Sequence, residues 1–381
     1  MKKISESPTF CPAPWTSLNI NQVGLVMPCM ASGFLLGNVK QNNVKEILKG
    51  DAIRALKRAQ EAGIWHAACS ECRDREQYGA SPRTQWHIEP ETVAKIDQDP
   101  ANFFEPHHIT INWSNLCNLS CTYCNEETST SWQSHKKIPI SHVRNNHDAL
   151  IELVTENSRS LKGLSLGGGE PLLQKGLVDF LKVIDPTDVS VLVTTNLSVD
   201  LNTNEVYQIL KTWPKVNWMI SFDNVNKDKF EYVRHGANWE VFCRNIDIMK
   251  SDNQAIQAHP AYSIYCALEL EEYYDFCYEK KLDLFWCDLI NPVPLDVRRR
   301  NETIRNRAIE QIDLVTSKYS DKMIGAFATL ERYRQHLVDP SHQRPVSEAE
   351  ADLKLFSSSV ESQLQKTKTF QELWPEVWNL L

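Results

Sequence analysis

The sequence lacks a long apolar run, and no stretch of about 18 consecutive apolar residues occurs, so we expect no membrane-spanning helix. Its first residues, MKKISESPTFCPAPW, contain two lysines but no apolar stretch after them, and a secretory signal is not expected. Basic residues are in deficit, with 41 Lys and Arg against 49 Asp and Glu, which disfavours a nucleic-acid-binding role. Repeats and low-complexity tracts are also missing. We therefore expect neither a membrane nor a nucleic acid as a partner.

Cysteine, in contrast, is abundant. Eleven cysteines without an export signal indicate a reducing, cytoplasmic compartment, where clustered cysteines bind metal or do redox chemistry more often than they form disulfides. Seven of them fall into two groups. The other four lie singly in apolar segments, and we expect them to be buried free thiols. These four are Cys243, Cys266, Cys277 and Cys287.

The middle of the chain alternates between strand-like and helix-like patterns. Strands are predicted at 107–114, 161–171 (a strand followed by a turn), 190–196, 216–223, 261–270 and 282–290. Helices are predicted at 142–157, 173–184, 204–213, 239–250, 271–281 and 301–315. Six strand–helix units in a row imply an α/β fold with a parallel sheet and right-handed crossovers. A doubly wound sheet and a curved partial barrel both fit this pattern.

Chemically distinctive residues follow the first four predicted strands. They are Cys117, Cys121 and Cys124 in LCNLSCTYCN, the GGGEP motif at 167–171, Asn196, and Ser221 with Asp223. The C-terminal ends of parallel strands are where barrel-like α/β enzymes build their active sites, so these residues predict one site. Three thiolates are one fewer than a structural zinc or an ordinary cubane cluster takes from protein, which leaves a coordination position open.

The C-x3-C-x2-C pattern, with Tyr123 before its last cysteine, and the GGGEP motif together resemble the radical SAM superfamily over roughly residues 107–290. This resemblance implies a partial (β/α)6 barrel. It also implies that Cys117, Cys121 and Cys124 each hold one iron of a [4Fe–4S] cluster, whose fourth iron binds S-adenosylmethionine (SAM). One electron, from a low-potential donor such as flavodoxin or ferredoxin, would then cleave SAM to methionine and a 5′-deoxyadenosyl radical, which takes hydrogen from substrate.

The motif glycines Gly168 and Gly169 would permit close approach to a ligand, and Glu170 would accept hydrogen bonds from the SAM ammonium. A turn carboxylate in solvent is the alternative for Glu170. Further candidates for binding SAM are Tyr123, Asn196, Ser221, Asp223 and Arg234.

Ser221, Asp223 and Asn196 are candidates for the ribose hydroxyls, although such residues also cap strand ends and turns for structural reasons alone. Arg234 resembles an arginine that several family members direct at the SAM carboxylate. A solvated helix arginine is the alternative reading of this position.

A second group of thiols lies near the N-terminus: Cys11, Cys29, Cys69 and Cys72. Four cysteines with this spacing would suit a structural zinc. The C-x12-G-x4-C pattern from Cys11 to Cys29, however, resembles the opening of the SPASM/twitch auxiliary-cluster module, and residues 37–59 look like its connecting helix. The resemblance implies one auxiliary [4Fe–4S] cluster. Unlike in most relatives, the module here precedes the barrel.

The expected organisation is an auxiliary-cluster domain (1–90), a linker (91–106), a radical SAM barrel (107–298) and a helical C-terminal extension (299–381). The run of three arginines at 298–300 predicts a solvated helix start. The resemblance implies an enzyme that modifies a residue of a peptide or protein. A small metabolite (a sugar, nucleoside or aminoglycoside-like compound) is the alternative substrate. A non-enzymatic iron–sulfur or zinc scaffold or sensor is the alternative of another class.

Overall fold

The computed structural model describes residues 3–77, 83, 88–139, 148–288, 292–319, 321, 327–339 and 346–381. The chain forms two compact units. The first unit comprises residues 1–116, 141–193 and 204–216, and the second comprises 117–140, 194–203 and 217–381. The residues of the expected barrel are divided between the two units.

In the first unit, neighbouring strands of the sheet follow the order β6-β5-β4-β1-β2-β3. Its strands are β1 (Ser17–Ile20), β2 (Leu25–Met27), β3 (Gly37–Asn38), β4 (His108–Asn112), β5 (Gly163–Gly167) and β6 (Ser190–Thr195). The strands β4, β5 and β6 are parallel, as predicted. The N-terminal strand β1 pairs in parallel with β4, from Ser17 opposite His108 to Ile20 opposite Ile111. The N-terminal region therefore extends the same sheet to which the first predicted barrel strand belongs.

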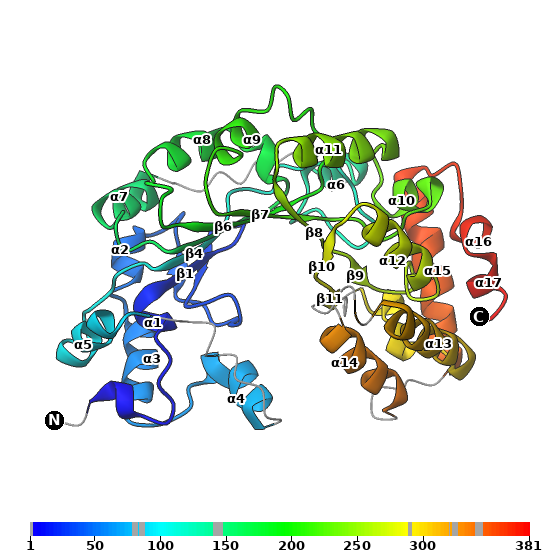
Figure 1. The fold of residues 1–381 in the computed structure, drawn as a ribbon. Helices are drawn as coiled ribbons and strands as arrows, with labels where there is room; N and C mark the ends of the chain where they lie inside the picture. The colour runs from blue at the N-terminus through cyan, green and yellow to red at the C-terminus, as the bar shows by residue number, and fades with distance from the viewer. Residues whose placement is uncertain are drawn as a thin grey trace. The chain divides into compact units, whose positions relative to one another are not determined.

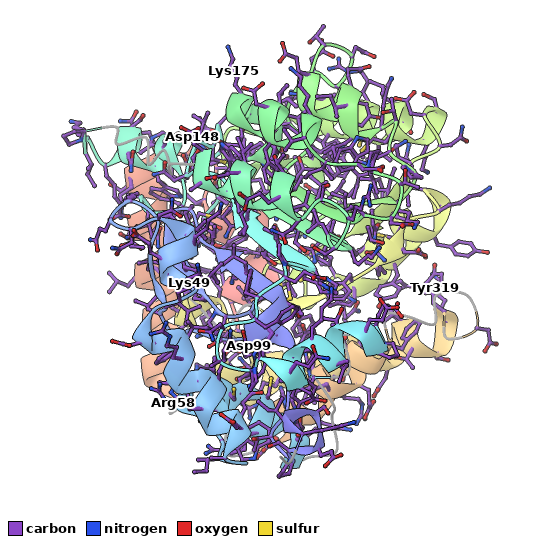
Figure 2. The ribbon with its side chains drawn as sticks, turned by 90° about the vertical axis from the view of Figure 1, so that its left-hand side faces the viewer. Lys49, Arg58, Asp99, Asp148, Lys175 and Tyr319 are labelled. Carbon is purple, nitrogen blue, oxygen red and sulfur yellow. The ribbon has the colours of Figure 1, made fainter. Side chains whose placement is uncertain are left out.

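The helices of the first unit are α1 (Ala13–Thr16), α2 (Val44–Ile47), α3 (Asp51–Glu61), α4 (Ser70–Gln77), α5 (Pro90–Gln98), α7 (Asp148–Glu156), α8 (Lys175–Lys182) and α9 (Glu205–Leu210). Helices α7, α8 and α9 lie on one side of the strands β4 and β6 (Figure 1). The charged side chains of Lys49, Arg58 and Lys175 point outward (Figure 2), while α8 turns Phe180 and Leu181 into the core. This division of faces is the amphipathic pattern that predicted these helices.

The helix α5 occupies much of the segment expected to be a linker. Its Thr92 and Ile96 are buried, and Ile96 packs with Ile4 and Trp15 in one apolar cluster. Pro90 at the first helical position is well tolerated there, because its missing N–H would have no partner within the helix. Residues 90–98 are therefore part of the packed first unit.

The second unit contains the parallel strands β7 (Val216–Ile220), β8 (Ala255–Ala258) and β10 (Asp283–Leu284), in the order β10-β8-β7, and a parallel pair of β9 (Ala261–Tyr262) and β11 (Cys287–Asp288). Its helices are α6 (Thr130–His135), α10 (Lys227–Val233), α11 (Trp239–Ser251), α12 (Leu270–Glu279), α13 (Glu302–Tyr319), α14 (Phe327–Val338), α15 (Val346–Leu364), α16 (Phe370–Leu373) and α17 (Pro375–Trp378). The C-terminal part is helical, as expected (Figure 1).

The predicted fifth strand is wrong in position. The strand that pairs with β7 is β8, which ends at Ala258, and Pro260, which has no N–H to donate to a ladder, then interrupts the chain. Residues 263–267 form turns in which Ala267 N–H donates to the Ser263 carbonyl at 2.9 Å. The segment is buried throughout, and continuous burial gives a loop the same apolar sequence pattern as a strand.

Two other expectations need correction. Cys266 and Cys277 are buried free thiols, as predicted, and Cys243 is half-buried, but Cys287 is exposed at the short strand β11. The arginine run is not a solvated helix start, since Arg300 is only 1% exposed.

Parts of two predicted elements, 142–147 and 289–290, lie outside the described residues. Within the described residues, no helix has the length and apolar character needed to cross a bilayer.

Candidate active site and auxiliary cysteine site

Residues 117–124, which we call the cluster loop, are held by hydrogen bonds to their backbone on two sides. The Ser120 and Thr122 N–H groups donate to the carbonyls of His235 and Val233, each at 2.9 Å, in the turn that follows α10. On the other side, the Ser129 hydroxyl at the N-cap of α6 donates to the Leu119 carbonyl at 2.6 Å. The loop is therefore positioned by bonds that do not depend on a cofactor.

The three thiols of the cluster loop have different surroundings. Cys121 is buried, and Cys117 and Cys124 are half-buried. A hydrogen bond between Cys121 and Cys124 lowers the pKa of Cys121 and raises that of Cys124, and the nearby Arg234 guanidinium lowers the Cys121 pKa further. Because the thiolate is the form that binds iron, this environment prepares Cys121 as a ligand.

A buried charged group lies directly beside Cys121. Arg234 is 6% exposed, and its Nε donates to Asp223 Oδ2 at 3.0 Å. Its Nη2 donates to the Tyr123 hydroxyl, which donates in turn to Asp223 Oδ2 at 2.9 Å. The Nη1 atom lies 3.9 Å from Cys121 Sγ. Arg234 is therefore not a solvated helix arginine.

The charge of Arg234 is held in place by its surroundings. Burial opposes the charge, but the Asp223 carboxylate keeps the Arg234 pKa above its ordinary value. Asp223 uses its other oxygen, Oδ1, to accept from the Ala261 N–H at 3.0 Å. Both carboxylate oxygens of Asp223 thus accept hydrogen bonds from protein groups. This matches the structural role that the sequence analysis gave as the alternative to binding ribose.

Asn196 and Ser221 also lie in the second unit. The Asn196 Nδ2 is 3.8 Å from Cys117 Sγ and donates to Asn118 Oδ1 at 3.2 Å. Its Oδ1 accepts from the Ser198 N–H at 3.0 Å, so Asn196 caps a turn as well as contacting the cluster loop. The Ser221 N–H donates to the Thr195 carbonyl at 2.9 Å. Asn118 was not predicted, because one more asparagine among the cysteines gives no distinguishing signal.

The glycine motif lies in the first unit, packed on residues 114–116, which directly precede Cys117 in the chain. A Cβ atom on Gly168, whose φ is +118°, would meet the Ser114 carbonyl oxygen at 2.7 Å, and one on Gly169 would meet that of Leu116 at 2.3 Å. Backbone N–H groups of Gly169 and Glu170 donate to these same two carbonyls at 2.9 and 2.8 Å. Glycine is therefore required at both positions by close backbone approach.

Glu170 is not a solvated turn carboxylate, because it is only 1% exposed. Its Oε1 accepts from the Leu172 N–H at 3.0 Å and caps the short 3-10 helix η4 (Pro171–Leu173). The carboxylate therefore has a structural role beside any role toward a ligand.

The second group of thiols comes together in the first unit. Cys11, Cys29, Cys69 and Cys72 line one cavity with Gln60 and Arg83. Burial raises the pKa of Cys11 to about 12 and of Cys29 to about 11, and it raises that of Cys69 to about 11 against a smaller lowering by Gln60. Within the described residues, no group of three or more His, Cys, Asp or Glu side chains is arranged to hold a single metal ion.

Gln60 and Arg83 were not predicted as parts of this cavity. Gln60 Oε1 accepts from the Cys11 N–H at 2.9 Å. Its Nε2 is buried and, apart from the interaction that lowers the Cys69 pKa, has no hydrogen-bond partner in the described part of the chain. Arg83 donates to the Phe10 carbonyl at 2.7 Å and pairs with Glu76. A buried amide donor without another partner, beside four thiols, fits a group with anionic sulfur acceptors such as an iron–sulfur cluster.

Two family models match the chain. Residues 111–255 match the radical SAM superfamily, and residues 11–73 match the SPASM iron-sulfur cluster-binding domain. Residues 111–255 therefore belong to the radical SAM superfamily, and a SPASM domain precedes them in the chain. The family, the α/β fold with its parallel sheet, and the cofactors, a [4Fe–4S] cluster with SAM and an auxiliary iron–sulfur site, are confirmed as predicted.

Curated relatives match only part of the chain. It is 28% identical over 143 residues to GTP 3',8-cyclase of Peptoclostridium acidaminophilum, covering 37% of this chain and 41% of that protein. It is 33% identical over 86 residues to 7-carboxy-7-deazaguanine synthase of Clostridium acetobutylicum, covering 22% and 35%. The chain thus spans less than two thirds of the length of these relatives.

Among solved structures, Streptococcus suis SuiB bound to the precursor peptide SuiA is 14% identical, with a TM-score of 0.44 and coverage of 79% of this chain and 69% of that chain. The enzyme anSMEcpe with bound AdoMet and Kp18Cys peptide is 15% identical, with a TM-score of 0.40 and coverage of 56% and 61%.

Proposed function

We propose that this protein is a radical SAM enzyme whose [4Fe–4S] cluster is held by Cys117, Cys121 and Cys124. The observation that carries the proposal is the cluster loop itself, with three thiols on one rigid turn and the buried guanidinium of Arg234 at 3.9 Å from Cys121 Sγ. When bound, the cluster and SAM together supply a 5′-deoxyadenosyl radical that takes hydrogen from substrate. A buried cation beside the thiolates suits a cluster of negative net charge, so the residues present fit this group.

The side chains around the cluster loop would hold SAM and orient it. Asp223 and Tyr123 fix the Arg234 guanidinium, whose fork is suited to a carboxylate such as that of SAM. We assign Asn196 and Ser221 to the ribose hydroxyls and Glu170 to the SAM ammonium, with Gly168 and Gly169 forming the turn that presents Glu170. These assignments rest on family resemblance and on the burial of the residues.

We further propose that Cys11, Cys29, Cys69 and Cys72 hold one auxiliary [4Fe–4S] cluster. The four thiols lining one cavity support this, as does the buried Gln60 amide donor beside them. The proposed compartment is a reducing cytoplasm, supported by eleven cysteines that are all free thiols. The proposed electron donor is a low-potential protein such as flavodoxin or ferredoxin.

The proposed substrate is a residue of a peptide or protein. Support comes from the SPASM domain, whose best-populated use in the family is peptide maturation, and from the chain beyond the radical SAM region at both ends. A second candidate is a purine nucleotide, because several curated relatives are GTP 3',8-cyclases, including those 28% and 26% identical over 143 and 139 residues.

Two experiments test the proposal. Anaerobically reconstituted protein given SAM and dithionite should release 5′-deoxyadenosine, and no release would refute the enzyme assignment. Deuterium-labelled candidates, namely peptides encoded near the gene and purine nucleotides, should then be offered. Deuterium in the 5′-deoxyadenosine from a peptide supports the first substrate class. Deuterium from a nucleotide, with none from any peptide, replaces it with the second.

A further inference from the structure

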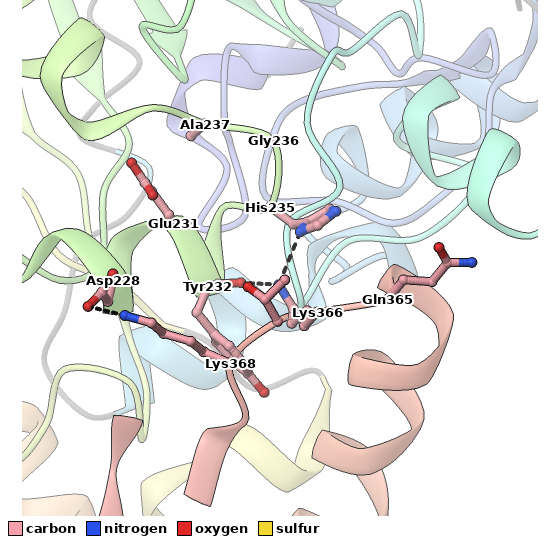
Figure 3. A pocket seen from close by; sticks show the side chains of 10 residues that line it. Asp228, Glu231, Tyr232, His235, Gly236, Ala237, Gln365, Lys366 and Lys368 are labelled. Atoms are coloured by element: carbon pink, nitrogen blue, oxygen red, sulfur yellow. Dashed lines mark hydrogen bonds and ion pairs between the residues drawn. The ribbon is translucent and has the colours of Figure 1, made fainter. Parts of the chain in front are cut away.

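A surface cavity of about 280 Å³ in the second unit is lined in part by His235, whose carbonyl accepts from the Ser120 N–H of the cluster loop. Residues 365–368, which follow α15 in the C-terminal extension, line one side of it, and Tyr232, His235 and Gly236 line the other (Figure 3). Neither sequence pattern nor the function proposed above assigns a role to this segment. Its central residue is Lys366.

Lys366 is a half-buried cation without an acidic partner. Its Nζ donates to the Tyr232 carbonyl at 2.6 Å and lies 3.4 Å from His235 Nδ1, as the dashed lines of Figure 3 show. Among the described residues it has no carboxylate within ion-pair distance, whereas the neighbouring Lys368 pairs with Asp228 at 2.5 Å. Burial lowers the Lys366 pKa to about 8, and a thiolate at Cys121 and the Glu361 carboxylate act in the opposite direction.

The segment 232–235 that holds Lys366 also holds the cluster loop, through other groups. The carbonyls of Val233 and His235 accept from Thr122 and Ser120, on either side of Cys121. The Lys366 ammonium acts on Cys121 from this turn, and the Arg234 guanidinium acts on the same sulfur. The charges of both cations thus act on Cys121; Arg234 pairs with Asp223, whereas Lys366 has no carboxylate within ion-pair distance among the described residues.

We propose that Lys366 supplies the counter-charge for the cluster held by Cys117, Cys121 and Cys124, and that its ammonium favours the one-electron reduced form of that cluster. This inference rests on the proposed function. Reduction by an external donor adds one negative charge to the cluster, and a nearby fixed cation lowers the free energy of the more negative state. Net charge and surroundings are established determinants of cluster potential. Lys366 would thus affect the reaction only through the charge state of the cluster, without touching the substrate.

A merely structural role, in which Lys366 only fastens the turn through the Tyr232 carbonyl, predicts different behaviour. Lys366→Gln retains a hydrogen-bond donor but removes the charge, Lys366→Arg retains both, and Lys366→Met removes both. Lys368→Met is the matched control, because it removes a neighbouring charge that already has a partner. Full-length, anaerobically reconstituted variants would be titrated with dithionite and followed by EPR, using the signal that changes when SAM is added.

In Lys366→Gln and Lys366→Met, the equilibrium between reduced and oxidised cluster should shift about three- to tenfold toward the oxidised form, where tenfold is about 59 mV for one electron. Lys366→Arg and Lys368→Met should stay within about twofold of the wild type, since each leaves the compensating charge in place. An unchanged potential in Lys366→Gln, or an equal shift in Lys368→Met, overturns the proposal. If Lys366→Met assembles no cluster, the comparison of Lys366→Gln with Lys366→Arg still tests the effect of the charge on the cluster potential. Absence of any SAM-responsive signal in the wild type would instead refute the proposed function.

Discussion

At the scale of single residues, the three cysteines of the cluster loop are chemically alike but differently placed. Cys121 faces Arg234, Cys117 lies beside Asn196, and Cys124 packs against α15. A cluster that already has one iron without a protein ligand has no spare thiolate to lose. Removing any one of the three sulfur atoms should therefore have the same effect on the cluster, whatever the surroundings of that cysteine.

Accordingly, Cys117→Ala, Cys121→Ala and Cys124→Ala should each reduce SAM cleavage to background and remove about four irons per chain, the content of one cubane. Iron analysis and chromatography of 5′-deoxyadenosine check this. Cys243→Ala is the matched control, because this half-buried thiol lies on α11 and belongs to neither cysteine group. SAM cleavage by the triple variant would show that the active site lies elsewhere.

Glu170 allows its two roles to be separated. Glu170→Gln keeps an oxygen to accept from Leu172 N–H but removes the charge, whereas Glu170→Ala removes both. We expect SAM affinity to fall about tenfold or more in both variants, since a truncated charged hydrogen bond costs about 1.5–3 kcal/mol. Only the Ala variant should also lose about 1 kcal/mol of stability, the usual cost of a lost cap. Equal SAM affinity of Glu170→Gln and wild type, by calorimetry, would reject the ligand role.

Lys57 on α3 provides a pH-dependent test of the first unit. Its Nζ donates to the Phe103 carbonyl at 2.8 Å and lies 5.6 Å from the centre of the Trp15 ring, and burial lowers its pKa from 10.5 to about 8. Below pH 8 both folded and unfolded chains carry the proton, and the folded state bears the cost of burying it. As the pH rises from about 8 to 10.5, the folded state loses this proton first, so stability rises.

The expected size of this rise is about 3 kcal/mol, from about 1.4 kcal/mol per unit of pKa shift. Urea unfolding of the metal-free protein between pH 8 and 10.5 measures it as the difference between wild type and Lys57→Met, which should lose the rise. The exposed Lys49, which Figure 2 shows pointing outward, gives the control Lys49→Met, whose pH dependence should match the wild type. A Lys57→Met curve parallel to the wild type would contradict the assignment.

At the scale of elements, the sequence predicted best where structure and chemistry are local. The alternation of Ile109 and Ile111 in β4, and the spacing of cysteines within ten residues, are visible in a short window. The fifth strand was misplaced because burial rather than pairing makes residues 261–267 apolar. Lys366 could not be predicted, because its bond to Tyr232 joins residues 134 positions apart.

The C-terminal helix α15 covers part of the cluster loop, which gives the extension a structural purpose. Val360 and Leu364 form one apolar cluster with Trp132, against which Cys124 packs. We expect Leu364→Ala to leave a cavity there, destabilising the protein by about 2–5 kcal/mol and giving water and oxygen access to the cluster. Loss of the iron–sulfur absorbance in air should then be several-fold faster. Leu355→Ala, at a residue of the same helix that is 73% exposed, should bleach at the wild-type rate.

At the scale of the whole molecule, the two cysteine groups lie in different compact units, the three in the second and the four in the first. The sequence led us to expect the groups in different domains (1–90 and 107–298), because they are far apart in the chain and follow different spacing rules. It could not predict that the N-terminal strand β1 would join the sheet beside β4, since β pairing between distant segments has no local signal. The auxiliary site is thus built on the same sheet as the first strand of the radical SAM region.

Because the two cysteine groups lie in different units, we expect a cysteine variant in one group to lose the iron of that group alone. Fully reconstituted protein should carry about eight irons per chain, the content of two cubanes. Cys69→Ala should lose about half of them and still release 5′-deoxyadenosine without coupling to substrate, because Cys69 and the cluster loop belong to different compact units. Cys117→Ala should retain the other half and release none. One zinc and only about four irons in the wild type would mean that the four N-terminal thiols hold zinc instead. Loss of all iron in either single variant would show that the two sites fold as one.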